Sequence, residues 1–291
     1  APAMGVDLHT HTTASDGSDS PAELVSAAAA LGLSAVAVTD HDTTEGLAEA
    51  EAAASRAGIE VVRGLELSLE WGRGAMHLLV LLIEDRHYLS SRLVRVREGR
   101  TRRNLEVVEL LRSLGMDVTL EEVREEGGSG TIGRPHFASL LVKKGYAPDI
   151  PAAFDLYLGR GRPAYVERFR LGPAEAIAAA HAAGGVAVLA HPLTLGVEGG
   201  RLSAVLEELS EQGLDGMEAY YGAYDPPTRR SLIELARRHG LVPSGGSDYH
   251  GRFKPDVKLG TGRGDLLVPD EVLAELRAAV AARRSPAPHR A

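Results

Sequence analysis

The feature that most constrains this chain is the alternation of short apolar segments with alanine-rich segments of helical spacing. Runs rich in Val, Leu, Ile and Ala indicate strands at 5–8, 35–39, 59–69, 77–83, 186–190, 215–219 and 241–244. The segments between most of them indicate helices at 21–31, 44–57, 173–183, 202–212 and 227–239. Strands and helices that alternate at this spacing favour a parallel sheet, either closed into a barrel or open.

One long segment interrupts the alternation. From Arg97 to Tyr165 the pattern is helical and no convincing strand is present. The apolar residues at helical spacing there are Leu105, Val108, Leu111 and Leu114. We therefore expect a main domain formed by 1–97 and 166–291, with 98–165 as an α-helical insertion folded over it.

Composition narrows the classes of partner and ligand. The net charge of −8 argues against a stable complex with duplex nucleic acid, because such binding depends on neutralising phosphates. No apolar run is long enough to span a membrane, and the first residues do not resemble a signal peptide. The chain has no cysteine, which fits a cytoplasmic location and means that any metal must bind through nitrogen and oxygen.

Residues of metal-ligand type follow several predicted strands. His9 and His11 come first, and because alternate residues of an extended segment project to one side, both imidazoles can reach one ion. Asp16 follows in the loop. After the second strand, His41 is the expected ligand, whereas Asp40 is expected to accept a hydrogen bond and orient its surroundings.

The remaining candidates lie on later strands. Glu66 and His77 are separated by a glycine-rich turn, and a hairpin could place them on one face, although the sequence does not fix its register. His191 ends another predicted strand, and Asp248 and His250 repeat the alternate spacing of the first pair. Nine candidates are too many for one ion, so we expect two or three divalent ions, with Mn, Zn or Fe equally compatible.

Each of these residues alone would more often be a cap or a surface residue than a ligand. The arrangement of several clusters at strand ends is much harder to explain in that way. Loops after parallel strands are where α/β barrels and open sheets build their active sites. The pattern as a whole therefore indicates a metal-dependent enzyme.

Five motifs together resemble the PHP (polymerase and histidinol phosphatase) family over residues 5–255. They are Asp7-Leu-His-Thr-His11, Thr39-Asp-His-Asp42, Gly64-Leu-Glu66, Ala190-His-Pro192 and Gly246-Ser-Asp-Tyr-His250. The resemblance implies a distorted (β/α)7 TIM-like barrel with a trinuclear metal centre. It implies three ion sites, formed by His9, His11, Glu66 and Asp248, by Asp16, His41 and His250, and by Glu66, His77 and His191.

Two further segments, 40–46 and the Gly133-Arg-Pro-His-Phe-Ala138 motif, are similar to one branch of that family. The branch includes nucleoside 3′,5′-bisphosphate phosphatases and short-RNA 5′ exonucleases. The resemblance implies that Arg134 and His136 reach the substrate phosphate. Arg134 and Pro135 also suit the start of a helix, and the two interpretations are compatible because helix N-termini bind phosphate.

Other residues could contribute to catalysis or substrate binding. Asp16 or Asp248 could steer the proton of the attacking water, and Tyr221 could stack on a base. Several basic residues could line the mouth of the site, although such residues usually form solvated helix faces. They are Arg100, Arg102, Arg103, Lys143, Lys144, Arg160 and Arg162. If two or three of them line the cleft, they could hold a second phosphate.

We expect a metal-dependent phosphoesterase that hydrolyses nucleoside monophosphates or 3′,5′-bisphosphates by attack of a hydroxide shared by two ions. One alternative is a 5′→3′ exonuclease on short RNA or DNA. Amidohydrolase-type hydrolysis is less favoured, because no lysine is expected near a strand end and Lys143 lies in the insertion. A third alternative is a non-catalytic module that senses metal or nucleotide.

Overall fold

One sheet of seven strands lies at the centre of the structure, a computed structural model that describes residues 5–127, 132–197 and 200–284. The strands are neighbours in the order in which they occur along the chain. Their bounds are β1 Val6–Asp7, β2 Ala35–Val38, β3 Glu60–Leu69, β4 Met76–Leu81, β5 Val186–Leu189, β6 Gly216–Tyr221 and β7 Val242–Gly246. Every strand expected from the sequence is present.

The sheet curls into a nearly closed barrel, because the chain beyond β1 pairs with the chain beyond β7. The Asp248 N–H donates to the His9 carbonyl at 2.8 Å, and the His11 N–H donates to the Tyr249 carbonyl at 2.9 Å. The expected α/β barrel of seven strands is confirmed. The same pairing brings two predicted clusters of ligand-type residues side by side.

Strand β4 runs opposite to the other six. It pairs antiparallel with both β3 and β5, whereas the remaining pairs are parallel. The expectation of a parallel sheet is therefore wrong at β4, because the turn between β3 and β4 is too short for the crossover that a parallel connection needs. The reversal places the first residues of β4 at the edge where the other strands end.

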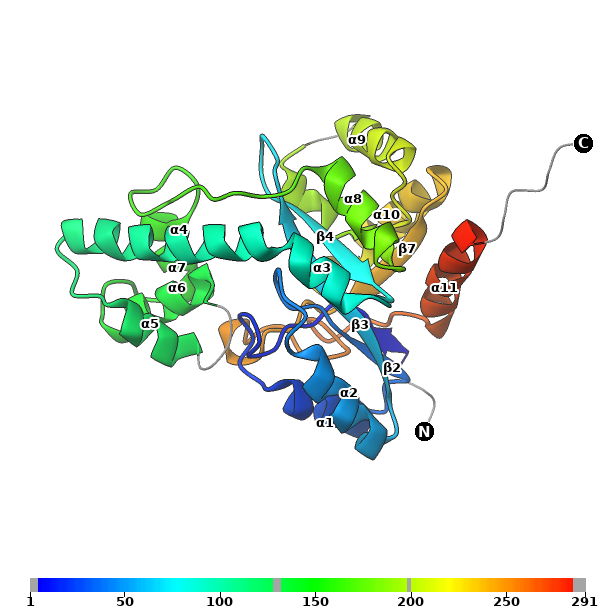
Figure 1. Ribbon diagram of the computed structural model, residues 1–291, viewed down its shortest axis with the longest axis horizontal. Coiled ribbons are helices and arrows are strands. Elements are labelled where there is room, and N and C mark those ends of the chain that lie inside the picture. Colours follow the sequence, from blue (N-terminus) through cyan, green and yellow to red (C-terminus); the bar gives the residue numbers. More distant parts are fainter. Residues whose placement is uncertain (1–4, 128–131, 198–199, 285–291) are drawn as a thin grey trace, which may run out of the picture.

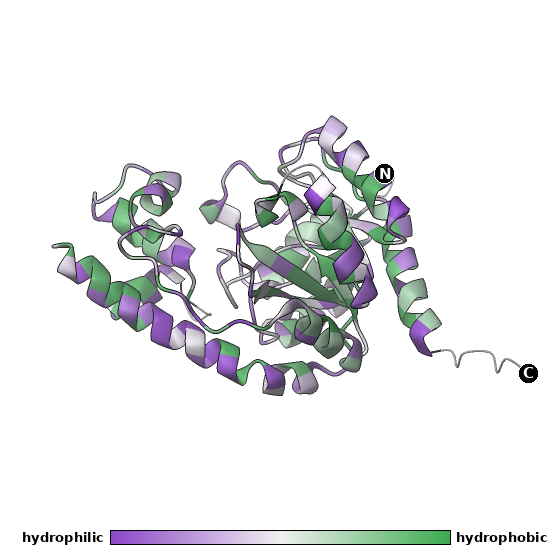
Figure 2. Cartoon of the chain, turned by 90° about the horizontal axis from the view of Figure 1, so that it is seen from above, coloured by the Kyte–Doolittle hydropathy of each residue, from purple (hydrophilic) through white to green (hydrophobic). Residues whose placement is uncertain are grey.

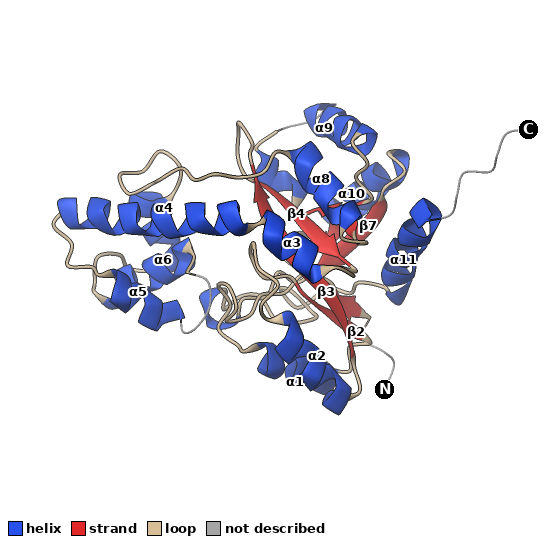
Figure 3. Cartoon of the chain, in the orientation of Figure 1, coloured by secondary structure: helices blue, strands red, loops and turns tan. Residues whose placement is uncertain are grey.

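Helices surround the sheet, as Figures 1 and 3 show. Those over the barrel are α1 Pro21–Leu31, α2 Leu47–Ala57, α3 Arg86–Arg92, α8 Pro173–Ala182, α9 Gly200–Glu211, α10 Pro226–Arg238 and α11 Asp270–Arg284. Single helical turns occur at η2 Pro192–Leu195 and η3 Gly251–Phe253. The sequence pattern did not predict α3 and α11. Within the described ranges, no helix is both long and apolar enough to cross a bilayer.

The strands form the apolar centre of the molecule (Figure 2). Every residue of β2 and β5 is buried. Helices α1 and α2 pack over β2 with Leu24, Val25 and Leu47, which are 0–1% exposed. Burying a side chain of this size stabilises the fold by about 1.5–3 kcal/mol, so the barrel is a rigid support for residues at its edge.

A helical lobe projects from the barrel between β4 and β5 (Figure 1). It contains α4 Val94–Ser113, α5 Leu120–Gly127, α6 Arg134–Lys143, α7 Ile150–Ala153 and the π-helical turn η1 Phe154–Leu158. The lobe has its own apolar cluster, which includes Leu111, Phe137 and Leu141. We retain 98–165 as the proposed insertion, although α4 begins a few residues earlier.

The helix indicated by the spacing of Leu105, Val108, Leu111 and Leu114 is present as α4, but its inward face is only partly apolar. Leu105 and Leu114 are 49% and 44% exposed. The buried residues of this helix are Val96, Arg100, Arg103, Asn104, Val107, Val108 and Leu111. Polar residues occupy the inward face nearest the barrel, where an apolar stripe would normally continue.

Candidate metal centre and active site

The predicted ligands converge at one edge of the barrel. The parallel strands end at this edge, so residues that follow β1, β2, β5 and β7 meet there. His77 joins them from the beginning of β4, because that strand is reversed. In the hairpin, Ser68 pairs with His77, which places Glu66 and His77 on the same face of the sheet.

The Glu66 carboxylate lies at the centre of the cluster. Its Oε1 atom is 2.8 Å from His77 Nδ1 and 3.0 Å from His191 Nε2. Its Oε2 atom faces three more imidazoles, at 3.1 Å from His41 Nδ1, 3.2 Å from His11 Nε2 and 3.4 Å from His9 Nε2. One buried carboxylate therefore contacts five histidines from four strands or strand ends.

Four donor atoms have the spacing of ligands around one ion. His9 Nε2 lies 3.1 Å from His11 Nε2, and Asp248 Oδ1 lies 3.5 and 3.4 Å from these two atoms. Together with Glu66 Oε2, these atoms give five distances of 3.1–3.5 Å. Bonds of 2.0–2.2 Å in a tetrahedron imply edges of roughly 3.3–3.6 Å. The set matches the first predicted site.

A second group surrounds Asp16. Its Oδ1 atom is 3.5 Å from both His11 Nδ1 and His250 Nε2, and its Oδ2 atom is 3.6 Å from His41 Nε2. These four residues could together hold an ion. The group contains the three residues of the second predicted site and adds His11, whose two ring nitrogens face different groups.

The third predicted set is also brought together, with His77 and His191 both on Glu66 Oε1. Two overlapping groups could hold an ion in the same region. One consists of His41, Glu66 and His77, and the other of His9, His191 and Asp248. All nine predicted ligands thus lie in one continuous cluster, although the geometry allows more than one division among ions.

The chemistry of this cluster fits cations. His11 Nδ1 and His41 Nδ1 are buried and make no hydrogen bond with the described residues. His9 Nε2 and His11 Nε2 lie only 3.1 Å apart. Two nitrogen lone pairs would repel each other at this distance unless they shared a proton or an ion. Buried polar atoms are normally satisfied, so these donor atoms indicate a ligand set of nitrogen and oxygen.

The carboxylates and imidazoles of the cluster shift one another's pKa values. Burial alone would raise the pKa of Glu66, but His41, His77 and His9 outweigh it and hold that pKa well below its usual range. Histidines lower the pKa of Asp16 in the same way, and Lys254, followed by His9 and His250, lowers the pKa of Asp248 against the effect of burial. Burial alone would lower the pKa of His11, but Asp248, Glu66 and Asp16 raise it to about 9.

A pH dependence of metal binding follows. At pH 7 the metal-free protein holds a proton on His11, and the pKa of His9 is also well above its usual value because nearby carboxylates outweigh burial. A cation must displace such protons, so its apparent affinity should rise between pH 6 and 9, by up to about tenfold per unit for each proton displaced. Chelator competition at several pH values would measure this. Equal affinity at pH 6 and 8 would contradict it.

Asp40 supports the site through a loop. Its carboxylate accepts hydrogen bonds from the Thr12 N–H and hydroxyl, at 2.8 and 2.7 Å, and from the Ser15 hydroxyl at 2.7 Å. It does not hydrogen-bond to a ligand imidazole within the described residues. Asp40 therefore fixes the loop that carries Asp16 and does not orient His41 directly.

Sequence reasoning missed three supporting residues. Glu218 on β6 is fully buried, with Oε1 3.0 Å from His9 Nδ1 and Oε2 accepting the His191 N–H at 2.7 Å. Asp7 accepts the N–H groups of Ser247 and Gly260 at 2.8 Å each. Both are acids within apolar strands, and that signal could have identified them.

Lys254 is the third supporting residue, and it corrects the expectation that no lysine lies near a strand end. Its Nζ donates to Asp248 Oδ2 at 2.5 Å, and the Tyr221 hydroxyl donates to the same oxygen at 2.6 Å. These two donors occupy Oδ2 and leave Oδ1 facing the imidazoles. Asp248 is also held at φ 58°, and a strained backbone of this kind is typical of functional sites.

Two glycines allow the closing segment to approach the site. A side chain at Gly246 would place its Cβ 2.4 Å from the His9 nitrogen, and one at Gly245 would come 2.1 Å from the Tyr220 carbonyl. Only glycine permits these contacts. These two glycines therefore allow β7, which leads to Asp248, to lie close against its neighbours in the barrel.

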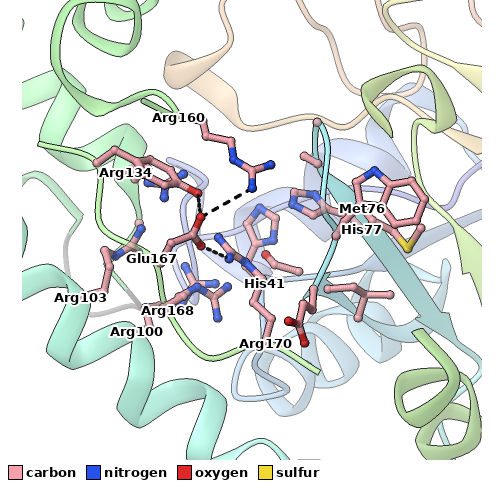
Figure 4. Close-up of a pocket in the computed structure, with 18 of the residues that line it drawn as sticks. His41, Met76, His77, Arg100, Arg103, Arg134, Arg160, Glu167, Arg168 and Arg170 are labelled. Atoms are coloured by element: carbon pink, nitrogen blue, oxygen red, sulfur yellow. Dashed lines mark hydrogen bonds and ion pairs between the residues drawn. The ribbon is translucent and has the colours of Figure 1, made fainter. Parts of the chain in front are cut away.

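A cavity of about 900 Å³ extends from this cluster toward the helical lobe (Figure 4). Asp16, His41, His77 and His250 line its inner end. Six arginines line the side near the lobe: Arg100, Arg103, Arg134, Arg160, Arg168 and Arg170. The volume suits a nucleotide-sized ligand, and the arginines suit an anionic one.

The two residues expected to reach the substrate phosphate differ in their exposure to the cavity. Arg134 begins α6 and lines the cavity, with its guanidinium 4.5 Å from the centre of the Tyr165 ring. His136 is fully buried, and its Nδ1 accepts the Gly133 N–H at 3.1 Å. A neutral ring then carries its proton on Nε2, which has no partner among the described residues.

Tyr221 is placed differently from the expectation that it stacks on a base. Its ring packs against those of His9 and His191, and its hydroxyl binds Asp248. It is not among the residues that line the cavity. The structure therefore gives Tyr221 a supporting contact with the ligand cluster.

Comparison with known proteins agrees with this geometry. A family model described as the PHP domain matches residues 7–96. A 5′-3′ exoribonuclease of Haemophilus influenzae is 35% identical over 245 residues, which cover 84% of this chain and 89% of that protein. A 3′,5′-nucleoside bisphosphate phosphatase of Chromobacterium violaceum is 35% identical over 247 residues, which cover 84% and 87% of the two chains.

A solved structure from Bifidobacterium adolescentis, assigned as a metal-dependent phosphoesterase, superposes with a TM-score of 0.83. The two chains are 34% identical, and the match covers 96% of this chain and 97% of the other. These similarities extend over nearly the whole barrel and the lobe, and they agree with the cluster of ligand-type residues at the barrel edge. The chain belongs to the PHP family and is a metal-dependent phosphoesterase.

Proposed function

We propose that this enzyme releases phosphate from nucleoside monophosphates or nucleoside 3′,5′-bisphosphates. The observation that carries the proposal is one cavity with a carboxylate–imidazole cluster at one end and arginines at the other. The relative from C. violaceum acts on 3′,5′-bisphosphates, as its name states. A phosphate at the cluster with a nucleoside toward the lobe would use both ends of the cavity.

The cluster would hold two or three ions of Mn, Zn or Fe. The proposed ligand sets are His9, His11, Glu66 and Asp248, then Asp16, His41 and His250, and finally Glu66, His77 and His191. When bound, such ions supply an activated water at neutral pH and neutralise the charge of the phosphate. The His9 ring is oriented for this role by Glu218, whose Oε1 lies 3.0 Å from His9 Nδ1.

The protein's own residues would do the remaining work. Arg134 lies on the cavity wall and is suited to hold non-bridging phosphate oxygens through paired N–H groups. His136 would donate from Nε2, the proton position that the bond from Gly133 favours. The Asp16 carboxylate acts electrostatically on this ring, so the donor would act on the Asp16 side of the cluster. The ring is fully buried and is not among the residues that line the cavity.

Two carboxylates could accept the proton of the attacking water. Asp248 Oδ2 is already bound by Tyr221 and Lys254. Among the residues that the structure describes, Asp16 forms polar contacts only with the Ser15 hydroxyl and three imidazoles. We therefore favour Asp16 for the proton and assign Asp248 to metal binding.

A second candidate function is 5′→3′ hydrolysis of short RNA or DNA. It is favoured by the H. influenzae relative, an exoribonuclease, and by a cavity wall rich in arginine. A nucleoside 3′,5′-bisphosphate and a 5′-phosphorylated RNA share a phosphate–ribose–phosphate unit. The choice between them depends on what the outer end of the cavity accepts.

The test is phosphate release by protein reconstituted separately with Mn, Zn and Fe. The substrates are nucleoside monophosphates, 3′,5′-bisphosphates, cyclic phosphates, histidinol phosphate and 5′-phosphorylated dinucleotides. We expect turnover of a monophosphate or a 3′,5′-bisphosphate with at least one metal. Activity confined to the dinucleotides would favour the exonuclease, and turnover of histidinol phosphate alone would reject both nucleotide functions.

A further inference from the structure

Arg103 is a buried cation without a counter-ion. Arg103 is only 4% exposed, and its side chain forms no hydrogen bond or ion pair with any described residue. It lies on the inward face of α4, between Val96 and Val107, where an apolar side chain would be expected. An unpaired buried charge is unfavourable, so a position of this kind indicates a ligand of opposite charge.

The surroundings of Arg103 are strongly positive. Burial first, and then Arg100, Arg134, Arg168 and Arg170, hold the pKa of Arg103 well below its usual range. Figure 4 shows these side chains gathered on one side of the cavity. No carboxylate is among the main influences on this group, which distinguishes it from its neighbours.

Most of the neighbouring arginines have a carboxylate partner within the protein. Asp42 binds both Arg100 and Arg168. Glu167 lies 2.8 Å from Arg170 and 3.9 Å from Arg160. Four of the six arginines on this wall thus share two carboxylates. Arg103 and Arg134 are left without an acidic partner among the described residues.

We propose that Arg103 binds a second phosphate of the substrate, distinct from the phosphate that is hydrolysed. The proposal rests on the function proposed above, because the scissile phosphate is taken to lie at the His, Asp and Glu cluster. Arg103 and that cluster line the same cavity, so one ligand can reach both. A guanidinium suits this role because its N–H groups can bind two phosphate oxygens at once.

The chemical unit that satisfies both ends is phosphate–ribose–phosphate. It occurs in nucleoside 3′,5′-bisphosphates and at the start of a 5′-phosphorylated oligonucleotide. A nucleoside monophosphate would leave Arg103 unpaired in the complex. Arg103 is therefore a specificity-determining residue, located on the helical lobe and not on the barrel.

The test compares Arg103→Met with Arg102→Met. Arg102 is the preceding residue of α4 and is exposed, and, contrary to the expectation that it could hold a phosphate, it is not among the residues that line the cavity. It therefore controls for loss of one positive charge on this helix. For each protein, kcat/KM is measured with a nucleoside 3′,5′-bisphosphate and with the corresponding 3′- and 5′-monophosphates. In Arg103→Met, the ratio of bisphosphate to monophosphate kcat/KM should fall about 100-fold, mainly through KM, and in Arg102→Met it should change less than about twofold.

Binding without turnover gives a second readout. With EDTA present, affinity for the 3′,5′-bisphosphate is measured by calorimetry, and Arg103→Met should weaken it at least about tenfold, with partial recovery in Arg103→Lys. The melting temperature of ligand-free Arg103→Met should not fall, because the substitution removes an unpaired buried charge. These two measurements separate a binding role from a loss of folding.

Several results would overturn the proposal. Equal loss on monophosphate and bisphosphate would place Arg103 at the scissile phosphate, and no loss on either would give it no part in binding. If wild-type protein released phosphate from no nucleotide, the proposed function would fail, whereas the metal-free binding comparison would still report on Arg103. A loss seen with a 5′-phosphorylated dinucleotide as well as the bisphosphate would support the shared unit, and a loss with only one would identify its source.

Discussion

Replacing Glu66 with glutamine is expected to lower kcat about 1,000-fold or more, because one change removes a charge that five histidines share. The contacts of 2.8–3.4 Å from Glu66 to these imidazoles come from both carboxylate oxygens. Glutamine keeps the shape but cannot bridge cations, so water activation and phosphate neutralisation are lost together. Phosphate release and metal content of the purified protein measure the two effects.

Glu70→Gln is the matched control. Glu70 follows β3, lines the same cavity and is exposed, with no side-chain partner among the described residues. It should retain wild-type metal content and a rate within about threefold of wild type. A Glu66→Gln protein that keeps more than about a tenth of the wild-type rate with full metal content would contradict the central role of Glu66.

The second large effect that we expect is a loss of stability in Asp42→Asn. Asp42 is buried beside His41 and binds Arg100 of α4 and Arg168 of the segment that returns to the barrel. Asparagine removes the charge but tolerates the left-handed backbone at φ 57°. Two buried guanidiniums would lose their carboxylate, which should cost about 3–5 kcal/mol and lower Tm by roughly 5–15 °C.

The pH dependence of this effect has a definite sign. Burial would raise the pKa of Asp42, but Arg168 and Arg100 outweigh it and lower that pKa well below its usual range. A group lowered in this way stabilises the fold above its unfolded pKa of about 4, and the contribution is lost as pH falls through the lower folded value. The difference in Tm between wild type and Asp42→Asn should therefore be full at pH 7 and shrink in acid.

Glu275→Gln provides the comparison for an exposed pair. Arg237 Nη2 donates to Glu275 at 2.7 Å, and the two side chains are 52% and 36% exposed. Such pairs contribute about 0–1 kcal/mol, so this variant should melt close to wild type. If Asp42→Asn also melted within about 2 °C of wild type, the Asp42 ion pairs would not be what attaches the helical lobe to the barrel.

The sequence predicted the strands well because each is a local apolar run. β2 and β5, for example, are buried along their whole length, and their composition alone reveals this. The pairing of β4 with β5 was not predictable in the same way, since it joins positions more than a hundred residues apart. The contact between Glu66 and His77 depends on the register of the β3–β4 hairpin, which the sequence does not fix.

The sequence predicted the candidate metal ligands but not the residues that support them. Histidines at alternate positions after strands are a local signal, whereas the contact of Glu218 with His9 joins positions 209 residues apart. The spacing of apolar residues does not reveal the inward face of α4 for a related reason. Its periodicity is interrupted by Arg100 and Arg103, which face a charged cavity and not an apolar core.

The central claim is that side chains from distant strands share cations at one edge of the barrel. Crystals of the metal-loaded protein, measured at the absorption edge of the bound metal, test it most directly. The account predicts an anomalous peak enclosed by His9, His11, Glu66 and Asp248, at about 2.0–2.3 Å from their ligand atoms. Full metal content with no anomalous peak among these four residues would contradict it.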